Sequence, residues 1–249
     1  QFSAWLALRR RLINGHFERA YDLQTSDRSG WYFRQFPKRD RPEWSGIVRG
    51  CSHPHTNPRR NHMHTVDRQA QQLHIAGVEN VSSANLDWLH GDITEIDCAG
   101  KFALLVPGGA AARLQKRWPL GSYVALAQRL MKCGVGVCLI GDASEGELQN
   151  CIGKAAGGVV ELAGKTDFAQ IAALARRSYV TIGNDTGPMH IIASCGVPTV
   201  VLFGNASNPA LCAPRGRNVV VVVAAADGRL ETLPGTSVWE AVLQARSVA

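Results

Sequence analysis

Hydrophobic positions after Lys101 fall into short β-branched runs separated by stretches with helical spacing. Tyr123, Leu126, Ala127 and Leu130 recur at i, i+3, i+4 and i+7, the spacing of an amphipathic helix. Nearly continuous apolar strands that alternate with helices are typical of a parallel sheet covered on both faces. Residues 101–235 therefore predict a Rossmann-like domain, followed by a C-terminal helix within residues 236–249. The expected strands are Phe102–Val106, Val135–Ile140, Val159–Leu162, Tyr179–Gly183, Thr199–Phe203 and Val219–Val223, with further helices at Phe168–Arg177 and from Pro188.

The first hundred residues show a sparser pattern. A helix is expected at Ser3–Ile13, a strand near Arg19–Leu23, a polar turn at Gln24–Ser29, a short strand at Ile47–Val48 and a helix at Val66–Ala76. These elements are too few to close a doubly wound sheet. Residues 1–95 therefore predict the back half of a second α/β domain, with the acidic stretch 91–100 as the linker.

Composition narrows the class of protein. Of the 249 residues, 45% are hydrophobic, which excludes a disordered chain and favours a soluble globular protein. The longest apolar run, Val219–Ala226, is far below the roughly 20 residues of a membrane span. Residues 1–68 hold thirteen basic and six acidic side chains within a total net charge of +7. Since no aromatic-basic nucleic-acid signature accompanies them, an anionic small molecule or lipid headgroup is favoured as the partner over a nucleic acid.

Cysteine and histidine usage gives no support for a metal site. The seven cysteines form no Cys-x-x-Cys pair, and Cys138 and Cys195 lie inside apolar runs. Buried free thiols in a reducing cytosol are therefore expected. The loop 53–64 is dense in histidine and follows Cys51, but its His-x-His pairs fit no structural zinc pattern. No metal is assigned.

The end of one predicted strand is the strongest candidate for a binding site. The run Tyr179–Gly183 turns through Asn184–Gly187 and enters a helix with Pro188 at its first position. Free amides of Met189 and His190 are expected to face a phosphate, and Gly187 would let the ligand come close. Asp185 would repel a phosphate, so it is assigned to sugar hydroxyls or to fixing the turn. The alternative is an ordinary helix start capped by Asp185.

Two other strand ends carry candidate chemistry. After Phe102–Val106, a Gly108-Gly109 turn leads to Lys116 and other basic residues, and a cation here could neutralise a leaving diphosphate. The alternative is a solvated basic loop. After Val135–Ile140, Asp142 or Glu145 could hold a ribose diol, or either could cap the next helix.

Four ordered motifs resemble glycosyltransferase family 9, the ADP-heptose:lipopolysaccharide heptosyltransferases. A weaker similarity extends upstream, through Asp22–Arg28 and His62–Gly77, so that the resemblance covers most of the chain. The motifs are Lys-Arg-Trp-Pro at 116–119, the segment Gly141–Glu145, Asn-Asp-Thr-Gly-Pro-Met-His at 184–190, and Gly-Val-Pro-Thr-Val-Val-Leu-Phe-Gly at 196–204.

The resemblance implies a GT-B-like architecture of two Rossmann-like domains facing a cleft, the N-terminal one incomplete here. It also implies metal-independent, inverting transfer of heptose from ADP-heptose to a lipopolysaccharide core acceptor, without a cofactor. Lys116 resembles the family's phosphate-contacting lysine and Glu145 its ribose-contacting acid. Asp185, Thr186, Gly187 and His190 match the donor loop, which also includes Pro188 and Met189.

Two features depart from the family pattern. The family's general base is an Asp in a Gly-rich loop after the first N-terminal strand, so the catalytic base is expected upstream of Gln1. After Phe203 the sequence reads Gly-Asn-Ala-Ser, where the family more often has Gly-Pro followed by Thr or Ser. Adenine-side contacts and donor identity are therefore the least constrained part of the resemblance.

Residues 1–95 are expected to contact the acceptor, an anionic core saccharide near the cytoplasmic face of the inner membrane. Gln24, Ser26 and Arg28 are the acceptor-side candidates, because an arginine fork pairs well with carboxylates or phosphates. The expected location is cytoplasmic, with peripheral membrane association. Two alternatives stay open: a non-catalytic nucleotide-sugar-binding module, and another GT-B-like enzyme such as a nucleotide-sugar epimerase, against which the Lys-Arg-Trp-Pro motif argues.

Overall fold

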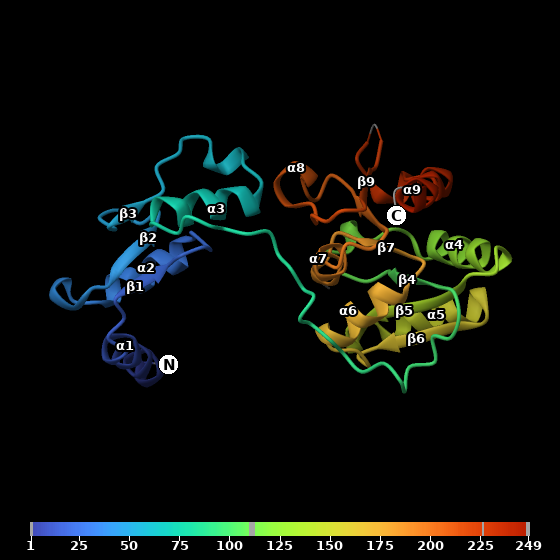
Figure 1. Ribbon diagram of the computed structural model, residues 1–249, viewed down its shortest axis with the longest axis horizontal. Helices are drawn as coiled ribbons and strands as arrows, with labels where there is room; N and C mark the ends of the chain where they lie inside the picture. Colours follow the sequence, from blue (N-terminus) through green and yellow to red (C-terminus); the bar gives the residue numbers. More distant parts are fainter. Residues whose placement is uncertain (1, 110–112, 226, 248–249) are drawn as a thin grey trace. The chain divides into compact units, whose positions relative to one another are not determined.

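The computed structural model describes residues 2–109, 113–225 and 227–247. The chain forms two compact units, residues 1–83 and residues 84–249, each with its own parallel sheet (Figure 1). No helix in the described part of the chain is both long enough and apolar enough to cross a bilayer.

Unit 1 is built on three short parallel strands in the order β1-β2-β3. Phe33, Phe36 and Trp44 form its buried core, with the rings of Phe33 and Trp44 in an edge-to-face contact. The elements are α1 (Phe2–Asn14), β1 (Arg19–Tyr21), α2 (Asp27–Gln35), β2 (Glu43–Gly46), β3 (His53–Pro54) and α3 (Thr65–Ile75), with 3-10 turns at Lys38–Asp40 and Arg60–His62.

Three sequence expectations for unit 1 are corrected. The strand expected at Ile47–Val48 is instead β2, because Trp44 provides the buried anchor while Val48 packs on the core after the strand has ended. The polar turn expected at 24–29 ends early, since Ser26 caps helix α2, which begins at Asp27. Strand β3 was not expected, because two residues carry no periodic signal.

Unit 2 contains six parallel strands in the order β6-β5-β4-β7-β8-β9. This is the doubly wound order of a Rossmann-like sheet. The strands are β4 (Phe102–Val106), β5 (Gly136–Gly141), β6 (Val159–Ala163), β7 (Val180–Asn184), β8 (Thr199–Phe203) and β9 (Val219–Val223). The doubly wound prediction is confirmed, and three strands have the expected bounds.

Alternating residues of each strand face two separate apolar layers. Ala103 and Leu105 pack with α4, α5 and α9, whereas Phe102, Leu104 and Val106 pack with α6 and α7. The edge strand β9 is only partly covered, and Val223 is 53% exposed. The helices are α4 (Leu120–Lys132), α5 (Gly146–Ala156), α6 (Phe168–Arg177), α7 (Gly187–Ser194), α8 (Pro209–Cys212) and α9 (Gly235–Ser247), with 3-10 turns at Leu114–Lys116, Ala143–Glu145 and Leu230–Thr232.

The acidic segment 91–100 is part of unit 2. Ile93, Ile96 and Cys98 pack against the layer that contains α6 and α7. Cys98 forms a disulfide bond with Cys138 of β5, so the expectation of free thiols is wrong for this pair. Both side chains face the same apolar layer, which brings two cysteines separated by 40 positions into contact. The other five are free, and Cys133 and Cys151 are exposed rather than buried.

Candidate functional site

The carboxyl ends of β4 and β7 lie side by side at the centre of the six-stranded sheet. The strand order reverses between them, with β5 and β6 on one side and β8 and β9 on the other. In open parallel sheets a ligand binds in the crevice at such a switch point. Three of the sequence candidates follow strands near this point. Lys116 comes after β4, Glu145 after β5 and Asp185 after β7.

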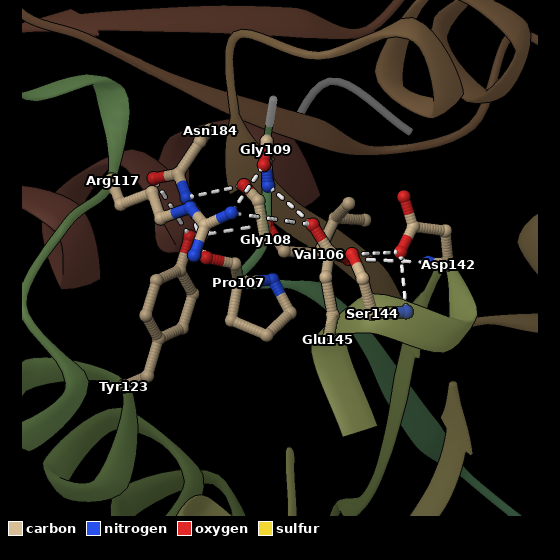
Figure 2. A network of polar contacts seen from close by, with 10 residues as sticks. All are labelled: Val106, Pro107, Gly108, Gly109, Arg117, Tyr123, Asp142, Ser144, Glu145 and Asn184. Carbon is tan, nitrogen blue, oxygen red and sulfur yellow. Dashed lines mark hydrogen bonds and ion pairs between the residues drawn. The ribbon is translucent and has the colours of Figure 1, made fainter. Parts of the chain in front are cut away.

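The Asn184 side chain links the ends of β4 and β7, and both of its polar atoms make two hydrogen bonds (Figure 2). Its amide nitrogen donates to the carbonyl oxygens of Pro107 and Gly108 at 2.8 and 3.0 Å. Its oxygen accepts from the Trp118 amide at 3.0 Å and from the Tyr123 hydroxyl at 3.1 Å. Four hydrogen bonds to one buried amide fix the carboxyl ends of β4 and β7 relative to each other.

Two aromatic residues support the Asn184 side chain: Tyr123, which lies in α4, and Trp118, which lies just before that helix. Burial raises the pKa of Tyr123 far above its usual value, so the hydroxyl stays protonated and donates. The Trp118 indole donates to the carbonyl oxygen of Leu233 at 3.0 Å and is itself buried. The aromatic residues of this region are therefore structural supports of the site.

Glu145 binds the turn that follows β4 (Figure 2). One carboxylate oxygen accepts from the Gly109 amide at 2.6 Å and the other from the Asp142 amide at 3.2 Å. A Cβ on Gly108 would lie 1.9 Å from the Glu145 carboxylate, and one on Gly141 would lie 2.1 Å from it. The two glycines therefore make room for the acid. Glu145 also forms a capping box with Asp142, so the helix-capping alternative describes part of its role.

Arg117 and Asp142 flank this acid. The Arg117 guanidinium donates to the Gly109 carbonyl and lies 3.9 Å from Glu145. Asp142 is exposed, and hydrogen bonds from the hydroxyl and amide of Ser144 lower the pKa of its carboxyl. In the turn after β4, Glu145 therefore binds the amide of Gly109 and Arg117 binds its carbonyl oxygen.

Lys116 and Asp185 form an ion pair across the switch point. Their side chains are only 16% and 9% exposed, and the Nζ–Oδ2 distance is 2.7 Å. The pair joins residues 69 positions apart in the chain. Lys116 is therefore not a solvated loop lysine, and its ammonium neutralises the carboxylate that would otherwise repel a phosphate.

The first turn of α7 differs in two respects from the sequence prediction, because the helix begins at Gly187 rather than at Pro188 and the Met189 amide already has a partner. The amide of Met189 donates to the carbonyl oxygen of Thr186 at 3.1 Å, so it is not free to face a phosphate. Gly187 is the first helical residue, and its amide has no partner within the helix. The Thr186 hydroxyl is buried and has no hydrogen-bond partner among the described residues. These two donors, rather than the Met189 amide, are available to an anion.

Short helix α8 adds a residue that the motifs did not indicate. Burial and the charge of Asp185 raise the pKa of the Cys212 thiol, and Lys116 partly offsets this effect. Cys212 therefore lies within electrostatic reach of the ion pair. Cys212 did not stand out in the sequence, because a small buried thiol has no periodic signature. Asn184 belongs to the 184–190 motif, but the motif did not indicate that its amide joins two strand ends.

The acceptor-side candidates are placed in unit 1 around the start of α2. Ser26 accepts from the Ser29 amide and caps the helix, whereas Gln24 and Arg28 are exposed. In the histidine-rich loop, His53 bonds to Ser52 and the buried His55 to Gln71. The described residues contain no group of three or more potential metal ligands.

Comparisons with known proteins find relatives of the chain among lipopolysaccharide heptosyltransferases. The chain is 35% identical over 104 residues to lipopolysaccharide heptosyltransferase 2 of Salmonella typhimurium, which is 40% of this chain and 30% of that protein. It is 30% identical over 118 residues to lipopolysaccharide heptosyltransferase 3 of Escherichia coli, covering 44% of this chain and 34% of that one. The matched stretch thus spans about a third of these relatives.

Solved structures show the same fold. The E. coli ADP-heptose lipopolysaccharide heptosyltransferase II superposes with a TM-score of 0.73 at 20% identity, over 97% of this chain and 80% of that one. E. coli heptosyltransferase WaaC with ADP gives a TM-score of 0.71 at 20% identity, over 98% and 77%.

The strand order and these superpositions identify the fold as GT-B-like. The family model of glycosyltransferase family 9 (heptosyltransferase) matches residues 5–237. The chain belongs to that family.

Proposed function

We propose that the protein transfers heptose from ADP-heptose to a lipopolysaccharide core acceptor. The observation that carries the proposal is the ion pair of Lys116 and Asp185 beside the start of α7, at the switch point of the sheet. A cation, a helix N-terminus and two available donors are the features that bind a diphosphate. Family membership supports heptose as the transferred sugar.

In this proposal the diphosphate lies between the Lys116 ammonium, the Gly187 amide and the Thr186 hydroxyl. Asp185, released from part of its contact with Lys116, accepts hydrogen bonds from hydroxyls of the sugar. Glu145 uses each carboxylate oxygen once for a backbone amide, so each oxygen keeps a lone pair for the ribose diol. Pro188, Met189 and His190 complete the donor loop.

Negative charge develops on ADP as its bond to the sugar breaks. The Lys116 ammonium and the positive end of the α7 dipole would stabilise that charge in place, without a metal ion. Attack by the acceptor hydroxyl from the side of the sugar opposite ADP, with its proton passing to a general base, would invert the anomeric centre. We therefore propose a metal-independent, inverting reaction.

The acceptor side is assigned to unit 1. The excess of basic residues in positions 1–68 favours an anionic saccharide and a peripheral contact with an anionic bilayer. The proposal places the reaction in the cytoplasm, at the inner face of the inner membrane. Gln24 and Arg28 remain acceptor-side candidates because they are exposed.

Calorimetry with ADP tests the donor site. Lys116→Ala removes a charge-assisted contact and leaves Asp185 unneutralised, so ADP affinity should fall by about 1.5–3 kcal/mol, or roughly 10- to 150-fold. Lys154→Ala, at an exposed position of α5, is the matched control and should bind like the parent. Unchanged ADP affinity in Lys116→Ala would remove this residue from the site.

A single-turnover assay with labelled ADP-heptose and lipopolysaccharide core acceptor distinguishes transfer from binding alone. The proposal expects label on the acceptor at an unchanged rate in EDTA. Tight ADP-heptose binding without transfer by the complete protein would identify a binding module. Release of an altered free sugar without acceptor would identify an epimerase.

A further inference from the structure

A second group of polar side chains lies at the carboxyl edge of the three-stranded sheet in unit 1. Asp22 directly follows β1, Gly46 ends β2 and His55 directly follows β3. The strands are parallel, so all three positions meet at one edge. The His55 amide donates to the Gly46 carbonyl at 2.8 Å, and a Cβ on Gly46 would lie 3.3 Å from the Asp22 Cβ.

Asp22 presents a carboxylate oxygen that the described residues do not use. The side chain is 7% exposed. Its Oδ1 accepts from the Thr25 amide at 2.8 Å, whereas its Oδ2 is buried without a hydrogen-bond partner. Buried carboxylate oxygens in folded proteins nearly always have a partner, so this one indicates a place for a hydroxyl or N–H from outside the chain.

Arg60 provides the opposite charge beside it. Its guanidinium donates to the Thr25 hydroxyl at 2.8 Å, and its Nε is buried without a partner among the described residues. Burial and the nearby Arg68 lower the pKa of Arg60, while the nearby Asp22 raises it. The Asp22 carboxylate and the Arg60 guanidinium therefore both bind Thr25, and the Arg60 Nε remains an available donor.

The backbone at Thr25 is held in an unusual conformation by these two residues. Its φ is +50°, in the left-handed region that β-branched residues rarely adopt. Asp22 binds its amide and Arg60 binds its hydroxyl. Such strain persists where surrounding contacts enforce it, and it concentrates at ligand-binding sites.

His55 adds an acceptor to the same edge. It is 3% exposed, and its Nε2 lies 2.8 Å from the Gln71 Oε1. That oxygen also accepts from Asn57, so the ring N–H that faces it is on Nε2. In a neutral ring this leaves Nδ1 as an acceptor, and the buried Nδ1 has no partner within the described residues.

We infer that Asp22, Thr25, His55 and Arg60, here called the Asp22 cluster, bind a hydroxylated sugar anion. Arg60 takes its carboxylate or phosphate, whereas the Asp22 Oδ2 and the His55 Nδ1 accept hydrogen bonds from its hydroxyls. The inference rests on the proposed function and assigns this cluster, rather than Ser26, as the part of unit 1 that holds the acceptor. The Ser26 side chain already accepts a hydrogen bond as the N-cap of α2.

Two small probes test the cluster by calorimetry: the free sugar acid Kdo for a carboxylate, and mannose 6-phosphate for a phosphate. Asp22→Asn keeps an oxygen for the Thr25 amide but replaces the free oxygen with a donor. Arg60→Lys keeps the charge but loses the planar fork. Each variant should lower the affinity for the probe that binds at least tenfold. Arg59→Lys, at an exposed neighbouring position, should not change it.

ADP affinity is measured on the same samples, because the donor site lies in unit 2. Unchanged ADP binding with lost probe binding in both variants supports the inference, and the probe that binds identifies the anion. Normal ADP binding with no binding of either probe, or equal probe binding by all variants, overturns it without affecting the donor site. Should circular dichroism show that Asp22→Asn is unfolded, Arg60→Lys decides the result.

Discussion

Asn184 shows how one residue can determine the geometry of a candidate site. Its side chain contacts the backbone of the turn after β4, the backbone before α4 and the Tyr123 hydroxyl, all in a buried environment. An amide with two donors and two acceptor positions is the neutral side chain that satisfies this arrangement. Lys116 and Glu145 can only be placed correctly if this junction is intact.

Asn184→Ala should therefore destabilise unit 2 strongly. Removal of the amide leaves several buried donors and acceptors without partners, each costing about 1–3 kcal/mol. We expect a loss of at least about 3 kcal/mol in the free energy of unfolding, measured by urea denaturation followed through tryptophan fluorescence.

Asn150→Ala is the matched control, because Asn150 is exposed on α5. It should change stability by less than about 0.5 kcal/mol. Equal effects of the two substitutions would contradict the role assigned to Asn184.

At the scale of elements, the turn after β4 depends on the absence of a side chain at Gly108. The Glu145 carboxylate occupies the space where a Cβ would be. Gly108→Ala should displace Glu145, cost about 1–3 kcal/mol of stability and weaken ADP binding in the same protein. Differential scanning calorimetry and an ADP titration measure both effects.

Gly121→Ala makes the same glycine-to-alanine change at a position where the added Cβ meets no other atom. A Cβ on Gly121 would have no neighbour within 4 Å, and the residue lies in the first turn of α4. Alanine has the higher helix propensity, so this variant should be neutral or stabilised by up to about 1 kcal/mol. A Gly108→Ala variant as stable as Gly121→Ala would show that Glu145 has room to move.

The disulfide between Cys98 and Cys138 attaches segment 84–100 to strand β5. Closing a loop of about 40 residues in the unfolded chain stabilises the folded state by roughly 4 kcal/mol in the chain-entropy model. Reduction should therefore lower the free energy of unfolding of unit 2 by up to this amount.

Alkylation followed by mass spectrometry checks the bond directly. Without reductant, iodoacetamide should modify Cys133 and Cys151, which are exposed, and leave the Cys98 and Cys138 peptides unmodified in denaturant. Alkylation of both without reductant would show that they are free thiols.

The sequence predicted elements well where each has its own periodic pattern. Strands β4, β8 and β9 and helix α6 have the expected bounds, and the apolar stripe from Tyr123 to Leu130 faces the core. Helix α2 and strands β2 and β3 were misplaced or missed, because capping by Ser26 and packing of Trp44 define them rather than periodicity.

The candidate site was predictable to the level of strand ends but not to the level of contacts. The rule for parallel sheets located Lys116, Glu145 and Asp185. It could not show that Lys116 and Asp185 pair, since 69 positions separate them, nor that the Met189 amide is already occupied. Partners of this kind are determined by tertiary structure alone.

At the scale of the whole molecule, charge is distributed unevenly along the chain. Residues 1–68 carry more than twice as many basic as acidic side chains, and helix α1 includes three consecutive arginines at positions 9–11. Each basic group near an anionic bilayer contributes about 1 kcal/mol of attraction, which salt screens over roughly 8–10 Å.

The full chain should therefore sediment with phosphatidylglycerol vesicles at low salt and be released by 0.5 M NaCl. Replacing Arg9, Arg10 and Arg11 with Gln should reduce the bound fraction severalfold. The matched control replaces three exposed lysines of unit 2, Lys132, Lys154 and Lys165, with Gln. Equal losses from both triple variants would argue against a membrane-facing role for α1.

The ion pair between Lys116 and Asp185 has one more consequence. The lysine already has a carboxylate partner that cannot diffuse away, so any anion that binds here must compete with a group at high effective concentration. Chloride or inorganic phosphate has no other group with which to offset that exchange. Under the proposed function, a nucleoside diphosphate ester also brings its ribose and sugar, so the pair would disfavour small ions relative to that larger ligand.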